Sequence, residues 1–136
     1  MTAPRLLAAY RCTEYGAAGA VARIGRRSAA VDAVLLSLGA REGAFVTAWN
    51  PWSRRMPPGW NARMLLRLRE AARRLPHAEG EGRARRWAER HLLLATDPRR
   101  AAVLARRFRQ SAMVVARVGA PARLVVLRPP TRPAPG

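Results

Sequence analysis

The feature that most constrains the fold is an amphipathic stretch at residues 60–75. With about 100° between successive residues, its apolar side chains fall on one side of a helix and its arginines on the other. Pro76 follows directly and predicts the end of this helix, because proline disfavours helical backbone in the residue before it. The apolar side of the helix needs a surface to cover, which favours a layered fold with helices on a sheet.

Short apolar segments supply the strands of such a sheet. Residues 44–49 (AFVTAW) and 91–95 (HLLLA) are apolar, short and rich in strand-forming residues, so they predict buried strands, the first of them central. Two further pairs of short segments predict hairpins at the two ends of the chain, namely 8–15 with 20–24 and 112–118 with 122–128.

Capping residues mark two more helices. Ser28 can cap the start of a helix at about residues 29–38, and Gly39 suits its end. Asp97 followed by Pro98 is a typical helix start, with aspartate as the cap and proline as the first helical residue.

The elements therefore follow in the order ββ-α-β-α-β-α-ββ. We expect one α+β domain over residues 8–128, with a mixed sheet of five to six strands and three main helices. Strands joined through a helix are expected to run parallel, by right-handed crossovers. Residues 76–89 are expected to be an irregular connection, and the proline-rich residues 129–136 an unpacked, disordered tail.

The charge of the chain is strongly positive. The formal net charge is +18, and all 26 basic residues are arginines. A GC-rich codon bias, as in some bacterial genomes, explains arginine in place of lysine, but it does not explain why only eight residues are acidic. Such a field favours anionic partners, for example nucleic acid or nucleotides. The alternative is that the arginines only form solvated helix faces.

Several classes of protein and site are excluded or disfavoured. The chain has no apolar stretch of roughly 18 residues, so no membrane span is predicted. Its single cysteine, Cys12, allows no internal disulfide, which fits a cytoplasmic location. The motifs GxGxxG, GxSxG, HExxH and the Walker loop are absent, and no cofactor is predicted. His77 and His91 lack neighbouring ligands, so no metal site is predicted.

Uncharged polar residues gather where the strand at 44–49 ends. Asn50 and Ser53 stand in the loop after this strand, on either side of Pro51 and Trp52, and Asn61 stands at the head of the long helix. Ligands of α/β sheets collect at such strand ends, and asparagine can both donate and accept hydrogen bonds. These residues therefore predict a ligand-binding loop. Alternatively, they only cap turns and helices.

The segment TAWNPWS (47–53), with Asn61 after it, resembles domain-of-unknown-function family 3293, a bacterial family of uncharacterised proteins. The resemblance covers residues 10–127. Further matches are Arg23, Ile24, Gly25, Glu89, Phe108 and Gln110. The family implies no activity, but the resemblance supports the site and adds Glu89 and Gln110 to it. Arg109 stands where the resemblance implies glycine, and we expect this cation beside Gln110 to alter or abolish access of the ligand.

The two added residues each have two interpretations. Glu89 is either a general base, or an acceptor for a ligand N–H, or else half of an exposed ion pair with a neighbouring arginine. Gln110 either contacts the ligand or only satisfies backbone groups of the loop. If the site is real, its residues should gather around one concave surface, namely Asn50, Ser53, Asn61, Glu89 and Gln110.

Two functions remain open from the sequence. The first is a site for an anionic or polar small ligand, including nucleotides, at the Asn-Pro-x-Ser loop; it could be enzymatic. The second is a nucleic-acid-binding module that uses the polar side of the long helix, formed by Arg63, Arg67, Arg69, Arg73 and Arg74. The sequence does not decide whether the chain is an enzyme, nor its oligomeric state.

Overall fold

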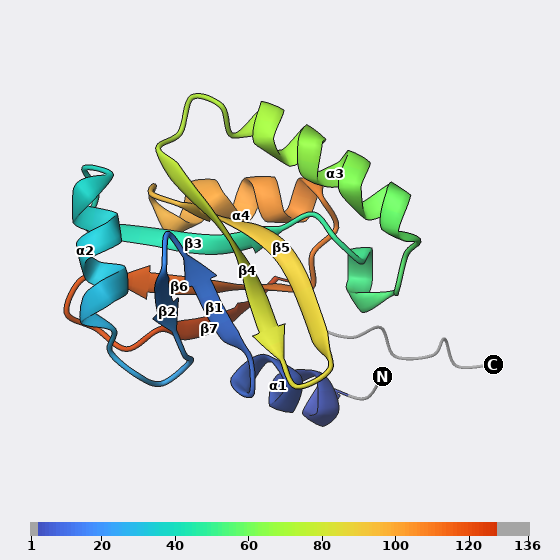
Figure 1. Cartoon of the computed structure of the whole chain (residues 1–136), viewed down its shortest axis with the longest axis horizontal. Helices are drawn as coiled ribbons and strands as arrows, with labels where there is room; N and C mark the ends of the chain where they lie inside the picture. Colours follow the sequence, from blue (N-terminus) through green and yellow to red (C-terminus); the bar gives the residue numbers. More distant parts are fainter. Residues whose placement is uncertain (1–2, 128–136) are drawn as a thin grey trace.

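The computed structural model describes residues 3–127, which form an α+β fold with seven strands and four α-helices (Figure 1). In chain order, the elements are α1 Ala3–Arg11, β1 Glu14–Ala17, β2 Ala20–Ala22, α2 Ala29–Ser37, β3 Glu42–Thr47, the short 3-10 helix η1 Pro51–Ser53, α3 Pro58–Ala71, β4 His77–Ala84, β5 Trp87–Leu94, α4 Pro98–Arg107, β6 Ala112–Arg117 and β7 Arg123–Val126. No helix within this part of the chain is long and apolar enough to cross a membrane. The predicted proline-rich tail lies outside the described residues.

All seven strands belong to one curled sheet in the order β2-β1-β4-β5-β3-β6-β7, and every ladder between neighbours is antiparallel. The chain segments beside the two edge strands, β2 and β7, meet at one point. An isolated parallel bridge joins Ile24, after β2, to Ala122, before β7. The Gly25 N–H donates to the Ala122 carbonyl (2.7 Å), and the Ala122 N–H donates to the Arg26 carbonyl (3.0 Å). These bonds hold the sheet in its curl.

The curled sheet has an apolar core on each face. Neighbouring residues of β3 point to opposite faces, as the period of two requires. Val46 belongs to the core under α3 and α4, which includes the fully buried Leu68, whereas Phe45 belongs to the core under α2, which includes Leu35. Burial of a leucine side chain of this kind contributes roughly 1.5–3 kcal/mol. β3, buried on both faces and flanked by β5 and β6, is central as predicted.

The capping residues act as the sequence predicts. The Ser28 Oγ accepts a hydrogen bond from the Val31 N–H at the start of α2 (3.2 Å), and Gly39 follows this helix with φ of +77°. The Asp97 carboxylate accepts from the Arg99 N–H at the start of α4 (2.8 Å). Both helices therefore begin where the sequence places them.

The N-terminal strand predicted at residues 8–15 is wrong in its first half, which belongs to α1. The strand itself begins only at Glu14. Leu6, Leu7 and Tyr10 are spaced three and four residues apart and are only half exposed, which is a helical pattern that alternation alone misses. The structure therefore has four helices in place of the predicted three.

The irregular connection predicted at residues 76–89 is also wrong. β4 and β5 form a long hairpin whose register runs from His77 opposite Leu94 to Ala84 opposite Trp87. Gly80 looks like a strand breaker in the sequence, but its place in the sheet requires glycine. A Cβ atom there would lie 1.8 Å from the Gly16 carbonyl oxygen of β1. This hairpin raises the number of strands to seven.

The predicted parallel pairing and mixed sheet are also wrong, because the β4–β5 hairpin places an antiparallel strand between the strands that were expected to pair. Because the antiparallel ladders alternate along the sheet, β3 and β4, which α3 joins, do run in the same direction, as do β5 and β6, which α4 joins. However, β5 lies between the first pair and β3 lies between the second. The helix-joined strands are therefore not neighbours, and no parallel ladder forms between named strands.

Replacing Gly80 by alanine should destabilise the fold, because the added Cβ meets the backbone of β1 and the two strands must move apart. We expect a loss of roughly 1–3 kcal/mol or more in the free energy of unfolding, measured by chemical denaturation. Gly59→Ala is the matched control. Its Cβ would meet only the end of the Arg63 side chain at 3.6 Å, so no loss is expected. Equal stability of the two variants would contradict the close contact between β1 and β4.

Candidate functional site

The exit of β3 is tied to the neighbouring strand by one side chain. The Thr47 hydroxyl donates to the Arg90 carbonyl of β5 (2.7 Å) and accepts from the Trp49 N–H (3.1 Å). Thr47, polar within an apolar strand, thus holds the start of the Asn-Pro loop beside β5. This is the strand that carries Glu89.

The loop after β3 has a strained backbone. Asn50, Trp52 and Ser53 have φ of 47°, 52° and 62°, which is the left-handed region that favours glycine. Each such residue costs on the order of 1 kcal/mol, although asparagine tolerates the conformation better than most. Strain of this kind persists only where surrounding contacts enforce it, and it clusters at functional sites.

Two asparagines provide those contacts by bonding to each other. The Asn50 N–H donates to Asn61 Oδ1 (3.0 Å), and Asn61 Nδ2 donates back to Asn50 Oδ1 (3.1 Å). The Met56 N–H also donates to Asn50 Oδ1 (2.9 Å). Asn61 is 5% exposed at the start of α3. The two amides therefore clamp the loop onto α3, and the protein itself uses the groups that the sequence suggested for a ligand.

Glu89 is fixed by the same clamp. Asn50 Nδ2 donates to Glu89 Oε1 (2.7 Å), and Glu89 forms no ion pair among the described residues, although arginines flank it in the sequence. Burial raises the pKa of Glu89 to about 7, and the bond from Asn50 opposes this rise. The other oxygen, Oε2, has no hydrogen bond within residues 3–127 and is not sealed from solvent. The exposed ion pair considered from the sequence does not form.

Tyr10 is the residue of this region that the sequence analysis missed. Burial raises the pKa of Tyr10 to about 12; the charge of Glu89 adds to the rise, and a hydrogen bond with the Ser53 side chain opposes it. The Tyr15 hydroxyl donates to the Tyr10 carbonyl (3.2 Å), which fixes the end of α1. Tyr10 of α1 is therefore bonded to Ser53 of the loop and lies within reach of the charge of Glu89 on β5. The helical spacing of Leu6, Leu7 and Tyr10 would have indicated that α1 buries this tyrosine.

Gln110 closes the loop from the other side by bonding to backbone. Its Nε2 donates to the carbonyls of Trp49 (3.0 Å) and Phe108 (3.2 Å), and only 5% of the residue is exposed. This is the backbone-satisfying interpretation of Gln110. Ser53 Oγ also lies 3.4 Å from Ser111 Oγ.

The five predicted site residues thus surround one loop, but their roles differ. Asn50, Asn61 and Gln110 hold the loop, whereas Ser53 is bonded to Tyr10 and Glu89 accepts a hydrogen bond from Asn50. Two shallow cavities of about 320 and 280 Å³ lie elsewhere, the first between α3 and α4 and the second along β1, β2 and β4. The predicted concave surface around all five residues is therefore not one of these cavities.

Arg109 has a structural explanation. It follows α4 with φ of 57°, and the Gln110 N–H donates to the Ala105 carbonyl (3.0 Å), which is the bonding pattern of a Schellman helix end. Glycine suits this position because it adopts positive φ without steric cost. The side chain of Arg109 is exposed. The glycine that the resemblance implies here would thus serve the backbone.

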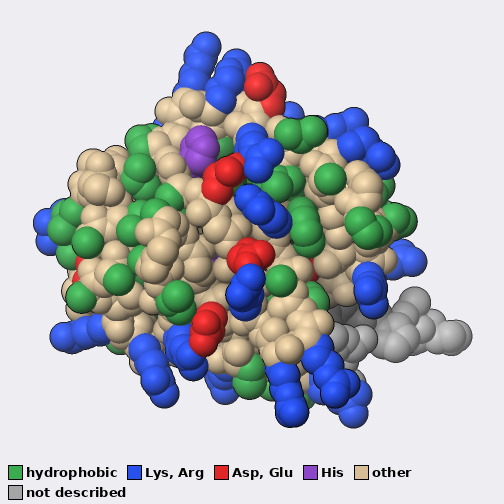
Figure 2. All heavy atoms as spheres, in the orientation of Figure 1, with side chains coloured by type: hydrophobic (Ala, Val, Ile, Leu, Met, Phe, Trp, Pro, Cys, Tyr) green, Lys and Arg blue, Asp and Glu red, His purple; other side chains and the backbone are tan. Residues whose placement is uncertain are grey.

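Two of the five arginines predicted on the polar side of the long helix are held in ion pairs. Arg69 pairs with Glu79 of β4, and Arg73 Nη1 lies 2.9 Å from Glu70 Oε1. Arg63, Arg67 and Arg74 form no ion pair within the described part of the chain. Figure 2 shows arginines at many places along the outline of one face, with acidic side chains among further arginines near its centre.

The buried histidine has a structural role. His91 Nε2 donates to the Gly16 carbonyl (2.6 Å), and its ring stacks on Tyr15 at a centroid distance of 6.2 Å. Burial lowers the pKa of His91 to about 4, so the ring is neutral near pH 7. Between residues 3 and 127, no group of three or more His, Cys, Asp or Glu side chains could hold a metal ion.

Glu89→Gln should change how stability depends on pH. The pKa of Glu89 is raised from 4.5 to about 7 in the folded protein, so folding favours the protonated carboxyl. The stability that the protonated Glu89 carboxyl contributes is fully present below pH 4.5 and is lost as the pH rises through about 7. Glutamine keeps an oxygen for Asn50 but does not ionise. Between pH 4.5 and pH 8, the free energy of unfolding of the variant should therefore rise by on the order of 3 kcal/mol relative to that of wild type. This follows from roughly 1.4 kcal/mol per unit of pKa shift.

The measurement is denaturant unfolding of both proteins across this pH range. His91 titrates in the opposite sense, because its folded pKa is lowered, but its contribution cancels when the two proteins are subtracted. Glu70→Gln, which removes an exposed carboxylate of α3, is the control for the loss of one negative charge. A stability difference between Glu89→Gln and wild type that does not change with pH would contradict the raised pKa of Glu89.

Arg109→Gly should stabilise the protein by about 1 kcal/mol, because glycine relieves the positive φ at the end of α4. Arg106→Gly, at an exposed position within the same helix, should destabilise it by about as much. Opposite shifts of the melting temperature of the two variants would support this explanation. A loss of stability in Arg109→Gly would contradict it.

The chain was compared with family models, curated proteins and solved structures. The family model described as "Protein of unknown function (DUF3293)" matches residues 46–113, which is half of the 136-residue chain. No curated protein and no solved structure matches. The matched region runs from β3 to the start of β6 and includes Asn50, Asn61, Glu89 and Gln110. The chain therefore belongs to the DUF3293 family.

Proposed function

We propose that Tyr10, Ser53 and Glu89 form a site for a small polar ligand, with Glu89 as the group that exchanges a proton with it. One observation carries the proposal above the others. Glu89 is a largely covered carboxyl with a single hydrogen-bond donor, and its pKa is raised to about 7. Near neutral pH such a group can either accept a hydrogen bond or donate one.

The surrounding residues support this role by holding the carboxyl in place. Asn50 donates to one carboxyl oxygen, and the strained loop and Asn61 fix Asn50 in turn. The other oxygen has no partner in the described structure. A group held on one side and open on the other suits recognition of a ligand, because no rearrangement is needed on binding.

The chemistry around Glu89 suggests the class of ligand. The hydroxyls of Tyr10 and Ser53 can donate or accept, and Arg54 and Arg55 are exposed in the same loop. A ligand with an N–H or O–H group for Glu89 and a negative group for the arginines fits these residues, and nucleotides belong to this class. If a reaction occurs, Glu89 is the general acid or base, because catalysis of this kind is most efficient with a pKa near the working pH.

The nucleic-acid alternative has less support. It depends on five arginines of the α3 region, and two of them are held in ion pairs with Glu70 and Glu79. Those pairs reduce the charge available to a phosphate backbone. We therefore place the small-ligand site first.

A thermal-shift screen of nucleotides and polar metabolites at pH 7 tests the proposal, since a ligand of the folded state raises its melting temperature. For a compound that binds wild type, Glu89→Gln and Ser53→Ala should weaken binding roughly tenfold or more, as expected for a lost hydrogen bond to a charged group or a hydroxyl. Binding to Glu70→Gln should be unchanged. Full binding to Glu89→Gln in a folded protein would reject Glu89 as a ligand contact.

A further inference from the structure

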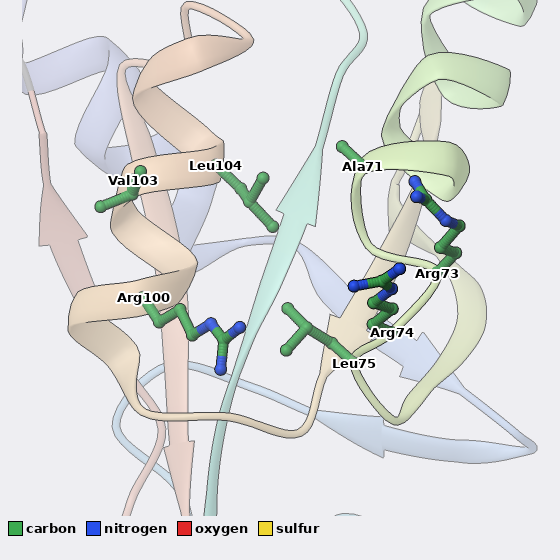
Figure 3. Close-up of a pocket in the computed structure, with 7 residues that line it drawn as sticks. All are labelled: Ala71, Arg73, Arg74, Leu75, Arg100, Val103 and Leu104. Atoms are coloured by element: carbon green, nitrogen blue, oxygen red, sulfur yellow. The ribbon is translucent and has the colours of Figure 1, made fainter.

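A second feature lies at the opposite end of α3 from the loop. The cavity of about 320 Å³ is formed by the turn after α3 and by one side of α4 (Figure 3). α3 has 14 residues, which makes it about 21 Å long, so this cavity is well separated from Asn61 at the start of the helix. Nothing in the arrangement around Glu89 involves it.

Cationic side chains surround this cavity. Arg74 reaches it from the turn after α3, and Arg100 reaches it from α4; both extend into the space between the two elements (Figure 3). Arg73 also lines it, but its guanidinium is paired with Glu70. Neither Arg74 nor Arg100 forms an ion pair within residues 3–127. Two unpaired cations on opposite sides of one hollow repel each other, and an anion between them would relieve that repulsion.

The rest of the cavity is apolar. In Figure 3, Leu75 lies between the two arginines and Leu104 extends from α4 above them. Val103 also lines the cavity. Val103 is 64% exposed, which leaves apolar surface in contact with water beside the cations. Covering such surface favours binding, because apolar area is removed from water. The cavity thus combines a place for a charge with a place for an apolar group.

Its size restricts the ligand further. About 320 Å³ is at the lower end of the range for small-molecule pockets. A polynucleotide would use a row of cations along its backbone and would gain little from Leu75 and Val103. A single anionic group with a short apolar body uses both parts of the cavity. Arginine suits carboxylates and phosphates equally, because its planar guanidinium can donate two parallel hydrogen bonds to either.

We propose that the cavity between α3 and α4 binds a small amphipathic anion, one carboxylate or phosphate group on an apolar body, held by Arg74 and Arg100 against Leu75 and Val103. The site is independent of the one proposed at Glu89. In this proposal, the arginines of the α3 region have different roles. Arg74 extends toward α4 and binds the anion, whereas Arg69 and Arg73 are paired with carboxylates.

The test uses the full chain and three probes at low ionic strength, namely phenyl phosphate, phenylacetate and inorganic phosphate, with affinity measured by calorimetry. Phenyl phosphate or phenylacetate should bind at least several times more tightly than inorganic phosphate, and the stronger of the two identifies the anionic group. The double variant Arg74→Gln with Arg100→Gln should weaken binding of that probe at least tenfold. The control Arg106→Gln with Arg107→Gln removes the same charge from exposed positions of α4 outside the cavity and should change affinity less than twofold.

Val103→Ser separates the apolar contribution, because this exposed residue can be changed without disturbing the core. It should weaken binding of the aromatic probe several-fold and leave inorganic phosphate unaffected. Three results would overturn the proposal: equal losses in the two double variants, affinity of wild type for both aromatic probes no higher than for inorganic phosphate, or no binding of any probe to the folded protein. Tight binding of single-stranded RNA that both double variants weaken alike would also overturn it, in favour of a general electrostatic field.

Discussion

The reciprocal hydrogen bonds between Asn50 and Asn61 are the contact on which the arrangement around the loop depends. They join the end of the central strand to the first turn of α3, so two elements that the chain connects by an irregular segment are held at a fixed distance. Asn50 then has one amide N–H directed at Glu89. Without the clamp, the strained backbone of the loop would relax, Ser53 would lose its position beside Tyr10, and Glu89 would lose the hydrogen bond from Asn50.

The hydrogen bonds of the loop after β3 compensate for the strain in its backbone. Three residues of the loop have positive φ, which together cost on the order of a few kcal/mol. Bonds from the Met56 N–H, from the Asn50 N–H and from Gln110 to the Trp49 carbonyl offset that cost. The polar residues suggested by the sequence as ligand contacts are therefore mostly the residues that make the loop conformation stable. The groups left for the proposed ligand are Ser53 and Glu89, which these hydrogen bonds help to position.

Local signals in the sequence predicted local structure well, and signals that depend on packing did not. Ser28 and Asp97 marked helix starts because a cap acts on backbone only a few residues away. Gly80 was misleading because its reason, the approach of β1, lies more than 60 residues earlier in the chain. Once the β4–β5 hairpin was missed, the antiparallel order of the sheet could not be predicted either. The polar cluster around Asn50 was predicted from residue type and position. Tyr10 was missed because residues 8–15 were interpreted as a strand, although the spacing of Leu6, Leu7 and Tyr10 is helical.

The chemistry of Glu89 argues against a purely architectural role for it. As a partner for Asn50 Nδ2, glutamine would accept the same hydrogen bond through its own oxygen, and it would not ionise. Burial makes the charged form of Glu89 unfavourable, which is why its pKa rises to about 7 and why it lowers stability at higher pH. A structural residue gains nothing from that cost. What a carboxyl offers here and an amide does not is a proton that can leave and return near neutral pH, and this is the property that the proposed ligand site would use.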